Sequence, residues 1–90
     1  MPALLIRHKV TNYAKWQSDF DKEEPTRSAH GCLVGRIFRN VSDPDEILIL
    51  LGWDNIERAR LFAQSDELWE QLKRDEVTDD ADLWFLHESN

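Results

Sequence analysis

The stretch Glu46–Trp53, EILILLGW, decides the fold. When it is extended, apolar side chains fall on both of its faces: Ile47, Ile49 and Leu51 on one, Leu48 and Leu50 on the other. A strand with two apolar faces is typical of the centre of a sheet that is covered above and below. The sequence therefore predicts a central strand here, with a separate cover on each side of the sheet.

Three further strands are predicted around it, at residues 3–10, 32–39 and 82–88, from short apolar runs bounded by turn-forming residues. The second and third strands are joined as a hairpin through NVSDPD, residues 40–45. Two helical regions fill the remaining gaps, so the order of elements is βαββαβ, a ferredoxin-like α+β pattern. We expect a single domain over residues 1–90, because a chain of this length holds one core.

The first helical region is predicted to begin after Thr11 or Asn12, because both residue types suit a helix N-cap. Tyr13, Trp16 and Phe20 then fall on one narrow helix face. Three aromatic side chains in such a stripe need a flat apolar surface, and we expect that surface to be the sheet.

Both helical regions are predicted to be interrupted. Pro25 lacks a backbone N–H, so the first region breaks before it, and Gly31 suits the C-terminal stop of the short helix that follows. In the second region, Asp54 and Glu57 have the spacing of a capping box. The apolar positions change phase after Ser65, which predicts a second break there.

Right-handed crossovers in this order of elements place the strands 4-1-3-2, with all helices on one face of an antiparallel sheet. The other face is then bare, although residues 46–53 are apolar on both sides. A second copy of the chain is the simplest cover, because soluble oligomers are mostly symmetric assemblies of one chain. We therefore expect a homodimer in which two four-stranded sheets close face to face into a barrel.

Composition excludes several classes of partner. The net charge is −7, which repels nucleic-acid phosphates and anionic membrane surfaces. The apolar run near the N-terminus, residues 3–6, is too short for a membrane span or a signal-peptide core, so we expect a cytoplasmic protein with no membrane partner. Cys32 is the single cysteine, which excludes an intrachain disulfide and a cysteine-based zinc cluster.

We expect neither a metal site nor a cofactor. In the predicted sheet the first and last strands are antiparallel, which separates His8 from His87 by about four residues along the strand, or roughly 13 Å. One ion cannot bridge that distance within a chain. Neither a Gly-rich phosphate loop nor a zinc-binding helix motif is present in the sequence.

Three segments resemble a known group of proteins: LLIRHKVTNYAKWQSDFD at residues 4–21, ILLGWDNIERARLFAQSDEL at 49–68 and DLWFLHE at 82–88. They are similar to the dimeric α/β-barrel superfamily that includes antibiotic-biosynthesis-type monooxygenases, over nearly the whole chain. The resemblance implies a dimer of ferredoxin-like subunits with a small organic ligand between sheet and helices. Some members oxidise phenolic polyketides without a metal or organic cofactor, and others degrade haem.

The sequence departs from both of these branches in its histidines. Monooxygenase-like members often carry a histidine on the helix after the third-strand tryptophan, where this chain has Phe62. Haem-degrading members use a helical histidine as an axial ligand, but His8, His30 and His87 all lie outside that helix. The resemblance therefore predicts the fold, and leaves open whether the chain is an enzyme.

Two rival sets of polar side chains are candidates for a site, because alternation does not decide which face of the first strand lines the cavity. His8 is either a structural histidine or a cavity-lining acid, base or hydrogen-bond donor. Arg7 lies on the opposite face, where it either binds an anionic or phenolate oxygen or forms a salt bridge at the interface or strand end. The same two alternatives apply to Arg36 on the second strand.

Aromatic residues supply the apolar part of a candidate ligand-binding cleft. Trp53, Phe62 and Trp84 either belong to the core or line a small cleft that suits a flat aromatic ligand.

The sequence thus predicts a small-molecule-binding dimeric α/β barrel. If it catalyses a reaction, we expect cofactor-independent oxygenation or proton transfer on an aromatic, phenolic or enolisable substrate, with His8 as base and Arg7 or Arg36 stabilising an oxyanion. The alternative is a non-catalytic ligand-binding or protein-interaction module. Open space beside His8 or Arg7 favours the enzyme, and filled cavities favour the module.

Overall fold

The computed structural model describes residues 1–75 and 81–89, and within them the elements follow the predicted order. Each of the two helical regions is split into two helices, as the breaks at Pro25 and Ser65 predict. The elements are β1 (Pro2–Lys9), α1 (Tyr13–Lys22), α2 (Glu24–Ala29), β2 (Cys32–Arg39), β3 (Glu46–Trp53), α3 (Ile56–Ala63), α4 (Asp66–Asp75) and β4 (Asp82–His87).

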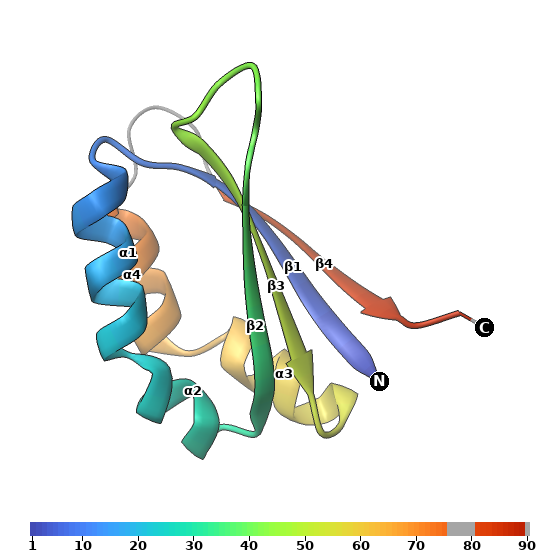
Figure 1. Cartoon of the computed structure of the whole chain (residues 1–90). Helices are drawn as coiled ribbons and strands as arrows, with labels where there is room; N and C mark the ends of the chain where they lie inside the picture. The colour runs from blue at the N-terminus through green and yellow to red at the C-terminus, as the bar shows by residue number, and fades with distance from the viewer. Residues whose placement is uncertain (76–80, 90) are drawn as a thin grey trace.

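The strands form one antiparallel sheet in the order β2-β3-β1-β4, which confirms the predicted order and the ferredoxin-like α+β fold. The helices lie together on one side of the sheet, and the other side is open (Figure 1). We call these two sides the helix side and the open face. As residues 46–53 predict, β3 is a central strand, paired with β1 on one flank and β2 on the other.

The core lies between the sheet and the helices. Alternate residues of the two central strands face the helices and are at most 4% exposed: Leu4, Ile6, Ile47, Ile49 and Leu51. Trp16 of α1, Phe62 of α3 and Leu72 of α4 belong to the same buried cluster, so three of the helices contribute to it. Burial of each large apolar side chain contributes roughly 1.5–3 kcal/mol, which holds the helix layer on the sheet.

Side-chain caps start α1 and α3, and the cap of α3 differs from the sequence prediction. Asn12 caps α1 as predicted, with its Oδ1 accepting from the Lys15 N–H at 3.1 Å. The predicted capping box at Asp54 is wrong: the N-cap of α3 is Asn55, whose Oδ1 accepts from the Arg58 N–H at 3.0 Å. The helix therefore starts one residue later than the spacing of Asp54 and Glu57 suggests. The Asp54 carboxylate, which is not the cap, instead forms an ion pair with the Arg58 guanidinium at 2.8 Å.

The break between α3 and α4 is formed by a single hydroxyl. Ser65 Oγ donates to the Phe62 carbonyl at 2.6 Å and accepts from the Leu68 N–H at 3.3 Å, so it ends one helix and starts the next. The Trp69 indole donates across the same break to the Ala63 carbonyl at 2.7 Å. No helix in the part of the chain that the structure describes is long and apolar enough to cross a membrane.

Candidate functional site

The sheet divides the predicted site residues into two groups. His8, Trp53 and Phe62 lie on the helix side, whereas Arg7, Arg36 and Trp84 lie on the open face. The register places the second group: Arg7 is opposite Leu48, Arg36 opposite Leu50, and Trp84 opposite Leu5. The structure therefore does not bring the six together, and Trp84 does not share a cleft with Trp53 and Phe62.

His8 occupies a buried position on the helix side of β1. It is 1% exposed and follows Leu4 and Ile6 along the same face of the strand. His8 lines neither the core void between the sheet and the helices nor the surface hollow between α2 and α4. A ligand held in these spaces therefore does not reach the His8 imidazole.

Trp53 and Phe62 pack on each other at the end of β3. Their ring centroids are 5.1 Å apart, and the side chains are 0% and 2% exposed. The Trp53 indole N–H is buried and has no hydrogen-bond acceptor among the described residues. Phe62 also forms part of the wall of an internal void, so one of the two predicted aromatic residues borders empty space.

This void lies in the core between the sheet and the helices and measures about 20 Å³. Its wall includes the aromatic rings of Trp16, Phe20 and Phe62, together with two polar residues, Arg27 and Gln71. A single water-sized group needs roughly 10–15 Å³, so the void has room for one such group and not for a ring.

Arg27 on α2 is not among the site residues that the sequence predicts. Its side chain is buried, at 7% exposed, and the guanidinium carbon lies 3.6 Å from the centroid of the Phe20 ring. Nη1 donates to the Phe20 carbonyl at 2.7 Å, in the last turn of α1. Burial lowers the pKa of the guanidinium, against the charges of Cys32, Glu24, Glu23 and Asp21, which raise it.

A surface hollow of about 460 Å³ adjoins the void. Its wall combines residues around the start of α2 with residues of α4: Glu23, Thr26, Glu67, Glu70, Gln71 and Lys73. Gln71 belongs to the walls of both the hollow and the void, so the two spaces are neighbours. The volume of the hollow falls within the range that small-molecule sites occupy.

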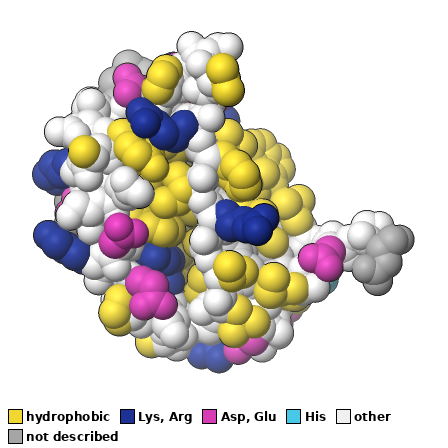
Figure 2. Space-filling view, viewed as in Figure 1, with side chains coloured by type: hydrophobic (Ala, Val, Ile, Leu, Met, Phe, Trp, Pro, Cys, Tyr) yellow, Lys and Arg dark blue, Asp and Glu magenta, His cyan; other side chains and the backbone are white. Residues whose placement is uncertain are grey.

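The open face is rich in exposed apolar side chains. Val34, Phe38, Trp84 and Leu86 are 43%, 50%, 44% and 39% exposed, and the register places all four on this face. Figure 2 shows hydrophobic side chains gathered over the open side of the sheet. A groove of about 470 Å³ runs over the same face, between Val34 and Arg36 on β2 and Leu86 on β4.

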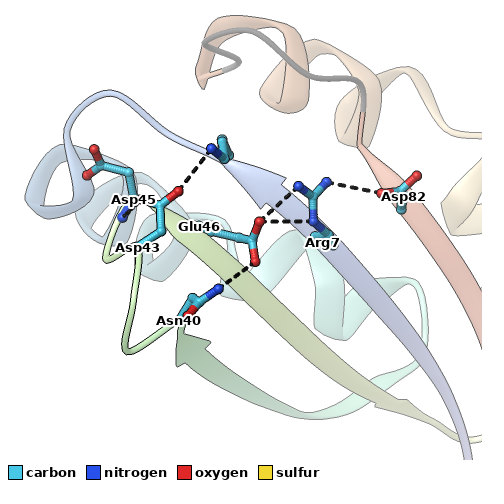
Figure 3. Close-up of polar contacts among 7 residues, drawn as sticks. Arg7, Asn40, Asp43, Asp45, Glu46 and Asp82 are labelled. Atoms are coloured by element: carbon cyan, nitrogen blue, oxygen red, sulfur yellow. Dashed lines mark hydrogen bonds and ion pairs between the residues drawn. The ribbon is translucent and has the colours of Figure 1, made fainter.

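Arg7 is held in ion pairs at one end of the open face (Figure 3). It contacts Glu46 at 2.8 Å and Asp82 at 3.1 Å, and these carboxylates raise the pKa of Arg7. Of its two predicted roles, the structure shows the strand-end salt bridge. Arg36, in contrast, is exposed and forms no ion pair with any residue that the structure describes.

The Glu46 carboxylate is held from two sides (Figure 3). The hydrogen bond from the Asn40 amide at 3.0 Å, and then the Arg7 guanidinium, lower the pKa of Glu46 against the opposing effect of burial. Lys9 contacts Asp43 at 2.9 Å and similarly lowers the pKa of that carboxyl. The charged groups at this end of the sheet are thus largely paired with one another.

No family model matches the sequence, and no curated protein matches it either. Solved structures do match its fold. An antibiotic biosynthesis monooxygenase is 12% identical, with a TM-score of 0.73 and 100% of both chains covered. SnoaB, a cofactor-independent oxygenase from Streptomyces nogalater, is 11% identical, with a TM-score of 0.76 over 99% of this chain and 93% of that one. A conserved protein from Methanosarcina mazei Go1 is 13% identical, with a TM-score of 0.75 over 98% and 92%.

Proposed function

Because the chain has the fold of the antibiotic biosynthesis monooxygenase structures, as its sequence resemblance predicted, we propose that it is a homodimeric α/β-barrel protein that binds a small aromatic or enolisable molecule. The observation that carries this proposal is the hollow of about 460 Å³ between α2 and α4, which adjoins a core void walled by aromatic rings. The hollow itself is lined by polar and charged side chains, and the aromatic wall of the void begins beyond Gln71, which the two spaces share.

The proposed partner on the open face is a second copy of the chain. Four large apolar side chains of this face are more than one-third exposed, which is typical of an interaction surface. Arg7 and Lys9 on this face are already paired with carboxylates of the same chain, so the face is close to neutral although the chain carries −7. A near-neutral apolar face can pack against an identical face without strong charge repulsion. The groove over Arg36 and Leu86 would then hold partner side chains inside a barrel.

Ligand binding, and not proton transfer by His8, is the function that this geometry favours. The void and the hollow are walled by α1, α2, α3, α4 and the sheet, but His8 lines neither space. SnoaB is described as a cofactor-independent oxygenase. For this chain we propose an aromatic or enolisable ligand, with no residue in the role of base.

Chemical-shift mapping of the full chain with 1-naphthol tests the ligand site, because this probe is neutral, flat and mostly apolar. We expect the backbone amides around Arg27 and Gln71 to shift, with no comparable change on the open face. The variant Gln71→Trp should weaken 1-naphthol binding at least tenfold, because the larger side chain fills the junction of the two spaces.

The matched control is Gln17→Trp, which adds the same side chain at an exposed position of α1 and should leave binding unchanged. Shifts confined to the open face, or equal binding by both tryptophan variants, would contradict the proposed site. An absence of any binding would instead support the protein-interaction module.

A further inference from the structure

We infer that the two copies of the proposed dimer are related by a two-fold axis that runs parallel to the strands, and that Arg36 of each copy forms an ion pair with Glu88 of the partner subunit. This inference rests on the proposed function, because it assigns the arrangement of that dimer. It is carried by the positions of two charges on the open face and by the direction in which the chain leaves β4.

The groove on the open face lies over a row of residues that are small at the centre of the sheet. In order across β2, β3, β1 and β4, the members of this row are Val34, Gly52, Ala3 and Leu86. The groove of about 470 Å³ runs between the larger side chains at the two ends of the row. Arg36 belongs to its wall on the β2 side, and Glu88 belongs to its wall beyond the end of β4.

The groove therefore has a cation on one side and a carboxylate on the other. Arg36 and Glu88 are both exposed, and neither forms an ion pair with any residue that the structure describes. They lie three strand spacings apart across the sheet, roughly 14 Å, and four residues apart along it, roughly 13 Å, so they cannot pair within one chain.

Closure of the barrel makes a partner for Arg36 necessary. Packing the open faces together removes them from water, and a charge that is buried without a partner is strongly destabilising. Among the described carboxylates at this face, Glu46 and Asp82 already contact Arg7, which leaves Glu88. Since Glu88 of the same chain is out of reach, the acceptor is Glu88 of the partner subunit.

The charges select one of the two symmetric ways in which the sheets can pack face to face. A two-fold axis across the strands places β2 on β2 and β4 on β4, so the two arginines lie on one side of the barrel and the two glutamates on the other. An axis along the strands places β2 of each copy beside β4 of the partner subunit. Opposite charges then meet at both seams of the barrel, and like charges are kept apart.

The tilt of strands in a barrel brings the two side chains to the same level. Within the sheet, the β4 residue level with Arg36 is Trp84, through the row that includes Leu50 and Leu5. Strands tilt by about 35–45° in a closed barrel, which displaces β4 along the barrel axis by roughly 8–10 Å over three strand spacings. The four residues from Trp84 to Glu88 return by a similar distance, because β4 runs opposite to β2 in a sheet of right-handed twist.

The direction of the chain after β4 favours the same contact. The helices lie on one side of the sheet, and the C-terminal end of β4 runs out on the other side, away from its neighbours (Figure 1). Glu88 directly follows β4, which ends at His87. The carboxylate is thus carried on a segment that extends towards the place of the second copy.

Reversal of the two charges tests the pairing. We expect Arg36→Glu and Glu88→Arg each to raise the dissociation constant of the dimer at least about tenfold in sedimentation velocity, because each places like charges together. The double variant should return to the wild-type value, since the reversed pair forms again across the interface. The control Lys22→Glu makes the same change of charge at an exposed position of α1 and should dimerise like the wild type.

A double variant as weak as the single variants would overturn the pairing. Dimerisation of Arg36→Glu at the wild-type concentration would also overturn it, because an axis across the strands only exchanges one pair of like charges for another. Circular dichroism checks that each variant is folded.

Cross-linking tests the axis without relying on the strength of the ion pair. Two chains, both carrying Cys32→Ser, are mixed with a short bismaleimide: one has Arg36→Cys and the other Glu88→Cys. The mixed dimer keeps one native pair, and we expect a covalent dimer from the mixture and little from either chain alone. Cross-linking of each chain with itself, or of neither combination in a dimer, overturns the inference and leaves the proposed dimer standing. If the wild type is a monomer, the proposed dimer and this inference fail together.

Discussion

Arg7 on β1 and Glu46 on β3 form an ion pair of 2.8 Å at one end of the open face, while the other oxygen of the same carboxylate accepts a hydrogen bond from Asn40 at 3.0 Å. Arg7 also contacts Asp82 at 3.1 Å, so a single guanidinium links β1, β3 and β4. An arginine held in this way contributes to the sheet and has little capacity left for a ligand.

We predict that the stability of the protein falls in acid partly through Glu46. The pKa of Glu46 in the folded chain lies below its ordinary value. Its contribution to the free energy of unfolding is therefore fully present above the ordinary carboxyl pKa of about 4.3, and it is lost as the pH falls through the lower pKa of the folded state. Asp43, with its lowered pKa, acts in the same direction. Chemical denaturation between neutral pH and about pH 3 should show a weaker pH dependence for Glu46→Gln than for the wild type. An identical dependence would contradict this assignment.

We predict that Gly31→Ala destabilises the protein by about 1–3 kcal/mol. Gly31 has a φ of 104°, and an added Cβ would lie 2.8 Å from the Arg58 Nε and from the Asp54 Oδ1. The matched control is Gly35→Ala, whose added Cβ would lie 3.4 Å from the nearest atom of Leu51. Urea denaturation of both variants measures the difference. A loss for Gly35→Ala as large as that for Gly31→Ala would show that strain at Gly31 is not the cause.

We predict that His8 resists chemical modification in the folded protein. Its side chain is 1% exposed, whereas His87 near the end of β4 is exposed. Diethyl pyrocarbonate followed by peptide mass mapping should modify His87 rapidly and His8 only after unfolding. Rapid modification of His8 in the folded chain would mean that reagents reach it, and would restore His8 as a candidate base.

We predict that a charge on the open face disrupts the dimer. Phe38 on β2 is 50% exposed on this face, and Leu61 on α3 is 66% exposed. Phe38→Glu should shift the chain towards monomer in sedimentation velocity because it would place two carboxylates inside the barrel. Leu61→Glu adds the same charge on a helix and should leave the oligomeric state of the wild type unchanged. An equal effect of both substitutions would argue against the open face as the interface.

The apolar pattern of the strands was enough to predict the sheet. The two apolar faces of residues 46–53 identify a central strand, and its partners and their order follow from the order of elements. The sequence predicts the cap of α3 one residue too early, because Asp54 and Asn55 both suit an N-cap and only the backbone decides between them.

Much less of the candidate site could be predicted. Arg27 stands among polar residues in EEPTRSAH, residues 23–30, where nothing indicates burial. Its contact with Phe20 crosses the break between α1 and α2, so it depends on the angle between two helices and not on a spacing. Alternation along β1 correctly separated His8 from Arg7, but only the position of the helices shows which of the two faces is covered.

We propose that two copies of this chain close their open faces into a barrel around the apolar side chains. Native mass spectrometry of the full chain, purified without denaturation, tests it most directly and also detects a retained small molecule. We expect a mass of about twice 10.6 kDa. A monomer at the same concentration, with Phe38 and Trp84 still open to solvent, would contradict it.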